Sequence, residues 1–172
     1  QIILGAALSV QSFAFIPLWG MSQGFQPAAG TNYGAKEYKR VKKITLGFSL
    51  GATVLAALFY LPVELMPKTV LSWFITDQTI VAQGAGPFRI MFSTYIVLGF
   101  LITVITLFQS LGKASKASVL VVLRQIALFI PLAFFLPNIG ELGIQGVFLA
   151  PALTDGLIFI LALCLMVSEF RN

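Results

Sequence analysis

The sequence contains no histidine and one cysteine, and only 10% of its 172 residues are charged. Without histidine, this chain cannot form a Ser-His-Asp triad, a Cys-His pair or a histidine-ligated zinc site. A lone cysteine cannot form an internal disulfide, which excludes a disulfide-rich secreted domain. Soluble domains carry about 25% charged residues, so the scarcity of charge also excludes an ordinary soluble protein. We therefore expect neither an enzyme nor a metal or cofactor site in this chain.

Apolar residues are abundant instead: they make up 58% of the chain, and the mean hydropathy is +0.95. A membrane-spanning helix needs about 20 mostly apolar residues, whereas a barrel strand has about 10 that alternate in character. The apolar stretches are long and continuous, and a helix satisfies its own backbone hydrogen bonds in lipid. We predict an all-α integral membrane protein whose five transmembrane helices span residues 2–26, 44–61, 90–111, 117–136 and 142–168.

The connection between the second and third spans is not uniformly polar. An apolar cluster at residues 70–75 predicts one or two helical turns lying at the membrane interface. Asp77 is placed to cap a following helix, and Gly84, Gly86 and Pro87 are expected to break the chain before the third span begins.

Basic residues are distributed unequally between the two ends of the predicted spans. Residues 36–43, the connection after the third span and the C-terminal tail carry eight of them, and the opposite side carries two. The positive-inside rule predicts that these basic regions and the C-terminus are cytoplasmic in the plasma membrane, with residue 1 outside. Because residue 1 is then outside and the chain enters directly in a hydrophobic segment, we expect a fragment that is preceded by an odd number of spans. The predicted cytoplasmic anchor, which we prefer to a nucleic-acid site, is Lys36, Lys39, Arg40, Lys42 and Lys43.

Small residues and a proline mark the first two spans. Gly20 and Gly24 lie four residues apart and predict a helix face that a neighbouring helix can approach closely. Gly47 and Gly51 repeat this spacing in the second span. Pro27 frees a backbone carbonyl one turn earlier, so it predicts a bend or a hinge near the end of the first span.

Three polar side chains within apolar spans are candidates for a substrate cavity. Gln23 and Gln26 are costly in lipid unless they face a wet cavity or form hydrogen bonds between helices, and both interpretations stay open. Asp155 is the one acid well inside a span, and it is either functional or a buried structural acid. Arg124 is a possible partner. However, side chains on antiparallel helices lean apart, so we expect Arg124 to reach toward the cytoplasm instead.

Residues 20–42 closely resemble the signature of the multidrug and toxic compound extrusion (MATE) family, which has the pattern G-x-S-Q-G-x-Q-P…N-Y-G-A…R-V-K. Here the segments are 20–27, 32–35 and 40–42. Features downstream are also similar to the family, namely Phe74 to Asp77, Arg89, Gln109 to Lys113, and Gly143 to Val147 with Pro151. The resemblance implies helices eight to twelve of a two-lobed, twelve-helix transporter.

Such a transporter would export organic cations or drugs across the plasma membrane by antiport with Na⁺ or H⁺. The resemblance implies small amphipathic substrates, and as partners the bilayer, the missing N-terminal lobe and the preceding helix. The family's coupling acids lie on the first, seventh and tenth helices. The third predicted span, residues 90–111, corresponds to the tenth helix and has no acid. The first and seventh helices would precede this chain, so the coupling residues are expected outside it. Two alternatives stay open: a flippase for lipid-linked saccharides and a structural membrane subunit without transport activity.

Overall fold

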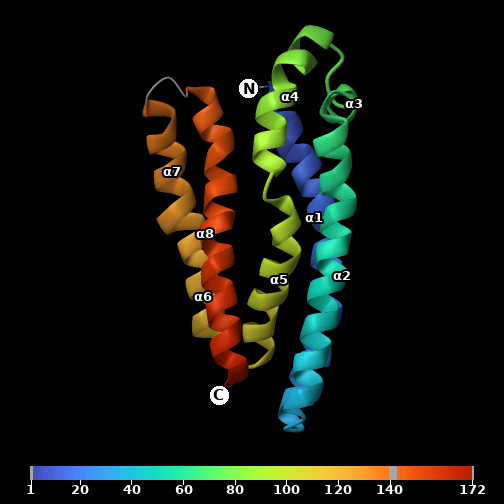
Figure 1. Cartoon of the computed structure of the whole chain (residues 1–172), viewed down its shortest axis with the longest axis vertical. Coiled ribbons are helices and arrows are strands. Elements are labelled where there is room, and N and C mark those ends of the chain that lie inside the picture. Colours follow the sequence, from blue (N-terminus) through green and yellow to red (C-terminus); the bar gives the residue numbers. More distant parts are fainter. Residues whose placement is uncertain (1, 140–142, 172) are drawn as a thin grey trace.

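The computed structural model describes residues 2–139 and 143–171, and these residues form helices and short connections without any strand. Five helical stretches within them are long and apolar enough to cross a membrane, which confirms the predicted all-α membrane fold. They run alternately up and down, so the two termini lie at opposite ends (Figure 1). The elements are α1 (Ile2–Gly34), α2 (Tyr38–Leu65), α3 (Pro67–Ser72), α4 (Gln78–Phe92), α5 (Tyr95–Ser110), α6 (Ala114–Val122), the π-helical η1 (Leu123–Phe129), α7 (Ile130–Phe135), the 3-10 turn η2 (Leu136–Asn138) and α8 (Ile144–Arg171).

Helix α1 extends eight residues beyond the predicted end of the first span, through Pro27 and on to Gly34. The predicted glycine-rich exit is therefore helical, and the Thr31 and Asn32 side chains donate additional hydrogen bonds to the carbonyls of residues 27 and 28. The turn that follows places Lys36 at a positive φ of 60°. Helix α2 then begins at Tyr38, so most of the basic segment lies on its first turns rather than in a loop.

The third span differs most from its prediction. Helix α4 begins at Gln78, with the Asp77 side chain accepting a hydrogen bond from the Thr79 amide as predicted. It then continues through Gly84, Gly86 and Pro87, so the expected break there is wrong. Gly84 is buried, and a Cβ built on it would lie 3.0 Å from Ile3 of α1, so tight packing holds this weak helical sequence in place. The chain is interrupted later, at residues 93 and 94.

The last two spans also differ in extent from the predicted ranges. The fourth runs over 114–138, and its middle, η1, is π-helical. The fifth was predicted from residue 142, which lies outside the described residues, and α8 covers Ile144–Arg171. Within an apolar segment of 18 residues taken from each stretch, 11% of the residues are buried in the fourth stretch and 56% in the third. The third stretch is therefore central and the fourth peripheral.

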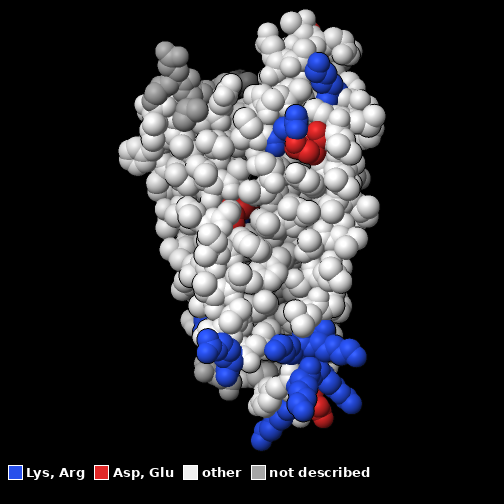
Figure 2. Space-filling view, in the orientation of Figure 1, with Lys and Arg blue, Asp and Glu red and all other residues white. Residues whose placement is uncertain are grey.

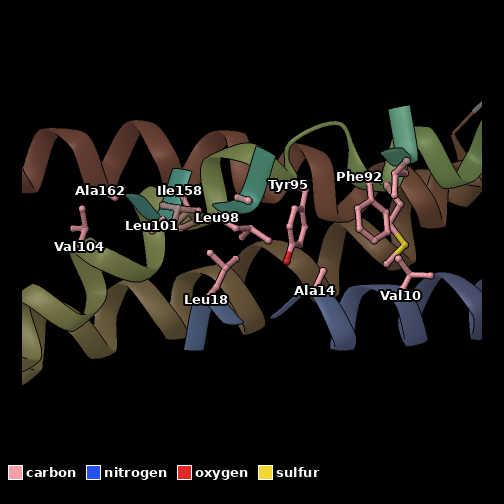
Figure 3. Packing of buried hydrophobic residues seen from close by; sticks show 14 of the residues in the cluster. Val10, Ala14, Leu18, Phe92, Tyr95, Leu98, Leu101, Val104, Ile158 and Ala162 are labelled. Carbon is pink, nitrogen blue, oxygen red and sulfur yellow. The ribbon is translucent and has the colours of Figure 1, made fainter. Parts of the chain in front are cut away.

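The core surrounds α5. Val10, Ala14 and Leu18 of α1 lie on one side of it, and Ile158 and Ala162 of α8 lie on another (Figure 3). A close backbone approach lies on a third side, at Gly99. A Cβ built there would lie 2.4 Å from the Ala52 carbonyl carbon and oxygen of α2. Helices α2 and α5 therefore approach so closely that no side chain fits between them at this point.

Candidate functional site

Lysine and arginine gather at the lower end of the molecule, where α1 meets α2 and where α8 ends (Figure 2). The sequence analysis predicts that these basic regions lie together on one side of the membrane. At the opposite end, Arg89 of α4 donates hydrogen bonds to Glu64 of α2. Many large apolar side chains are exposed between the two ends, as the hydrocarbon core of a bilayer requires.

The basic end is held together by contacts between elements far apart in the sequence. Lys113 and Lys116 both bind Glu169 near the end of α8, and the Lys116 contact measures 2.8 Å. The hydrogen bond to Glu169 raises the pKa of Lys113, so this amine stays protonated throughout the physiological range. Lys42 lies 5.9 Å from the ring centroid of Phe170. A cleft of about 480 Å³ opens here, with Lys39, Lys42, Lys113, Glu169, Tyr33 and Tyr38 among its lining residues.

Two cavities border Arg124 and Gln125 within the apolar part of the molecule. The first, of about 410 Å³, lies between α1, α5 and the α6–η1 stretch, and we call it the amide cavity. The second, of about 330 Å³, lies between α1, η1 and α8, and we call it the aspartate cavity. The amide cavity is lined by Phe15, Trp19, Ser22, Gln23, Leu98, Leu101, Ile102, Ile105, Thr106, Gln109, Val121, Arg124 and Gln125. The aspartate cavity is lined by Leu4, Leu8, Gln11, Met91, Arg124, Gln125, Phe129, Val147, Pro151, Thr154 and Asp155.

An ion pair joins η1 to α8 between these cavities. Arg124 Nε donates a hydrogen bond of 2.7 Å to Asp155 Oδ1. The expectation that Arg124 turns toward the cytoplasm is therefore wrong. That argument considered the directions of the Cα–Cβ bonds and neglected the length of the arginine side chain. The arginine side chain is long enough to reach the buried Asp155 carboxylate, which would otherwise be left without a charge partner.

The polar residues singled out in the sequence have different surroundings. Gln23 lines the amide cavity, and Asp155 lines the aspartate cavity. Gln26 is exposed and lines neither of them. Sequence reasoning did not select Gln109 and Gln125, which also line the amide cavity. The signal for both was present, because each is an amide within or at the end of an apolar run.

The floor of the amide cavity contains one hydrogen bond between helices. The Ser22 and Thr106 hydroxyls lie 3.1 Å apart and join α1 to α5. Both residues are buried, and Thr106 also donates to the Ile102 carbonyl. This arrangement satisfies the polar atoms of the floor and fixes α1 against α5, so the wall that carries Gln23 is held in place.

The glycines of the two predicted packing faces also differ. A Cβ on Gly51 would meet the Met21 side chain at 2.6 Å, so α1 packs closely there. Nothing in the described part of the chain lies within 4 Å of a Cβ on Gly20, Gly24 or Gly47. A packing role for these three glycines stays a prediction, because it would require a neighbour outside the described residues.

Five apolar helical stretches, with an ion pair joining two of them and exposed amides along the cavities between them, define an α-helical, multi-pass membrane protein. Comparison with solved structures gives the same fold. The chain superposes on a MATE structure in complex with MaL6 with a TM-score of 0.91, at 16% identity over 99% of this chain and 38% of that one. It also matches a ligand complex of the MATE multidrug transporter DinF-BH, with a TM-score of 0.86 and 32% identity over 97% of this chain and 37% of that one.

The MatE family model matches residues 3–135, and the chain belongs to this family. No match was found among curated proteins. The chain spans about 38% of the length of the solved structure that it matches with the highest of these scores. The resemblance noted in the sequence is thereby confirmed at the level of the family and the fold.

Proposed function

We propose that the protein containing this chain exports organic cations or other amphipathic drugs by antiport with Na⁺ or H⁺. Membership of the MatE family supports transport, because its model covers most of the chain. The observation that carries the proposal is the pair of cavities, in which amides and a charge pair adjoin apolar and aromatic walls. Such a mixture suits broad recognition of amphipathic molecules. It favours a transporter over a saccharide flippase or a structural subunit.

Two comparisons support a mechanism in which these helices move as a unit. The chain superposes on an inward-facing MATE structure with a TM-score of 0.87 and on an outward-facing one with a TM-score of 0.89. One arrangement of the five spans thus fits both states about equally well. This favours alternating access by rocking of one lobe against the other, rather than rearrangement within this part of the fold.

The coupling cation is proposed to bind outside this chain. Asp155, the acid buried within the last span, already holds Arg124. Its charge is therefore compensated, which makes it a weak ligand for Na⁺ compared with an unpaired carboxylate. We propose a structural role for Asp155 in which it positions Arg124 between the two cavities.

Transport should be tested with the whole protein in vesicles loaded with a fluorescent organic cation. We expect a Na⁺ gradient or a pH gradient, imposed separately, to drive efflux. We expect residues 1–172 alone to transport nothing, because one wall of the pathway is missing. Efflux that responds to neither gradient would contradict coupled antiport, and efflux by the isolated chain would contradict the two-lobed pathway.

The basic end is proposed to face the cytoplasm of a plasma membrane. We expect a cysteine placed at Lys39 to resist an impermeant thiol reagent in intact cells and to react after the cells are opened. Cys164 is exposed in this chain, so it should first be replaced by serine. A cysteine at Lys68, near the opposite end of α2, is the matched control and should react in intact cells. The reverse labelling pattern would invert the proposed topology.

A further inference from the structure

The cleft of about 480 Å³ at the lysine-rich end, which we call the basic cleft, carries a surplus of positive charge (Figure 2). Lys39, Lys42 and Lys113 line it, and Glu169 is the one acid in its lining among the described residues. Glu169 is already shared between Lys113 and Lys116. Lys39 and Lys42 form no ion pair within the described part of the chain. The cleft therefore offers cations that have no anionic partner.

Two of the lysines are held at the cleft by adjacent residues of α8. Lys113, from the connection between α5 and α6, donates a hydrogen bond to Glu169. Lys42, from α2, lies 5.9 Å from the ring centroid of Phe170. An ammonium group has three N–H donors, so Lys113 keeps two beyond the one that Glu169 accepts. Amines from two separate elements are thus positioned to donate to one anion in the cleft.

Lys39 and Lys42 also repel one another. They lie three residues apart on α2, so they share one face of the helix, and like charges at such a spacing destabilise it. The acid nearest to them in the sequence, Glu37, lies 3.9 Å from Arg40 instead. An anion bound between the two lysines would remove this repulsion.

The apolar surroundings of the cleft favour a lipid over a free anion. Tyr33 and Tyr38, whose rings lie 5.6 Å apart, form part of the lining. Tyrosine is enriched where a membrane meets water, because its ring is apolar and its hydroxyl is polar. Leu46 and Leu50 follow Lys42 at intervals of four residues on the same face of α2, and they are 53% and 67% exposed. This arrangement places a cation at the head of an apolar strip, which suits a headgroup phosphate and an acyl chain.

We infer that the basic cleft binds the phosphate of an anionic phospholipid, with Lys39, Lys42 and Lys113 as its cationic contacts. A volume of about 480 Å³ is sufficient for a phosphodiester headgroup. Basic pockets between membrane spans are a general way of binding such headgroups. The bound lipid joins α2, the connection between α5 and α6, and the end of α8. This inference goes beyond the proposed transport, because it concerns a lipid that the protein retains and not a substrate that it moves.

The inference can be tested by photolabelling the whole protein in phosphatidylcholine liposomes. The probe is a phosphatidylglycerol that carries a diazirine near its headgroup, added in increasing amounts, and mass spectrometry locates the labelled residues. We expect labelling within residues 33–42 and 111–113, and unlabelled phosphatidylglycerol should reduce it. Inorganic phosphate offers similar oxygens without acyl chains, so it should compete no better than chloride at equal ionic strength.

Two neighbouring lysines provide a matched pair of variants. Both are exposed, but Lys42 lines the cleft and Lys43 does not. Lys42→Gln should raise the amount of probe needed for half-maximal labelling about fivefold, which corresponds to about 1 kcal/mol for one lysine at an anionic headgroup. Lys43→Gln should change it by less than about twofold. Lys39→Gln/Lys42→Gln should raise it at least about tenfold, and size-exclusion chromatography would confirm that each variant is folded.

Three results would overturn the inference. Equal effects of Lys42→Gln and Lys43→Gln would show a diffuse attraction to the membrane surface and no site. Equal labelling by a phosphatidylcholine probe would exclude selection for negative charge, and displacement by inorganic phosphate would assign the cleft to a free anion. Failure of the proposed function is a separate result, because it would appear as absent ion-driven efflux while the labelling of the cleft is as expected.

Discussion

Asp155→Asn in the whole protein is expected to cost about 3 kcal/mol of folding free energy, the low end for breaking a buried ion pair. The neutral amide leaves the Arg124 charge without its partner in an apolar region, and that loss dominates the effect. The expected result is a lower melting temperature in detergent and a reduced folded yield. Dye export should fall in proportion to the amount of folded protein, because we assign Asp155 a structural role.

A double-mutant cycle gives the test its control. Adding Arg124→Gln to Asp155→Asn removes the unpaired charge, so the double variant should be more stable than the sum of the single losses predicts. The exposed pair between Arg40 and Glu37, 3.9 Å apart, is the matched reference. Glu37→Gln should change stability by less than about 0.5 kcal/mol. If Asp155→Asn were as mild as Glu37→Gln, the buried pair would contribute no stability. Full yield with abolished ion-driven efflux would instead assign Asp155 to coupling.

Gly99→Ala is expected to be the most damaging change of a single methyl group in this chain. The new Cβ would lie 2.4 Å from the Ala52 carbonyl of α2, and backbone cannot give way as a flexible side chain can. Helix α5 would have to move away from α2 along the central contact of the fold. We expect a loss of about 3 kcal/mol, measured as a lower melting temperature of the whole protein.

Gly20→Ala is the matched control, because a Cβ at Gly20 has no neighbour within 4 Å in the described chain. Replacing an exposed helical glycine by alanine should raise stability by up to about 1 kcal/mol. Destabilisation at Gly20 would show instead that another part of the whole protein packs on this face, as the glycine spacing predicts. A neutral Gly99→Ala would contradict the close contact between α2 and α5.

The sequence was sufficient for the class, the number of spans and the arrangement of charge. Hydropathy and the positions of lysine and arginine depend on the solvent around each segment, so they can be interpreted without knowing how the helices pack. The Asp77 cap was equally accessible, because the hydrogen bond to Thr79 spans two residues. The ends of the helices were harder to predict from the sequence, since α1 and α4 continue past glycine and proline residues.

The site was less accessible because it depends on how helices meet. Gly99 lies outside any glycine pair, and its contact with Ala52 follows from the crossing point of two helices. The Arg124–Asp155 pair joins residues 31 positions apart, and the directions of the Cα–Cβ bonds argued against it. Of the polar candidates, Gln23 could be recognised as a cavity residue, but nothing in the sequence distinguished it from Gln26, which lines neither cavity.

The π-helical turn at Leu123–Phe129 has a consequence for how this span evolves. A π turn accommodates one residue more than an α turn, so it behaves as a single-residue insertion absorbed without a loop. Loss of one residue from this stretch would restore a continuous α-helix, and the side chains before and after it would keep nearly the same directions. The same deletion in a regular α-helix would rotate one side of the helix by about 100° relative to the other. The aromatic and proline residues of α7 would therefore stay on the side of the bundle that they occupy here, so this stretch tolerates a length change of one residue without a change of face or topology.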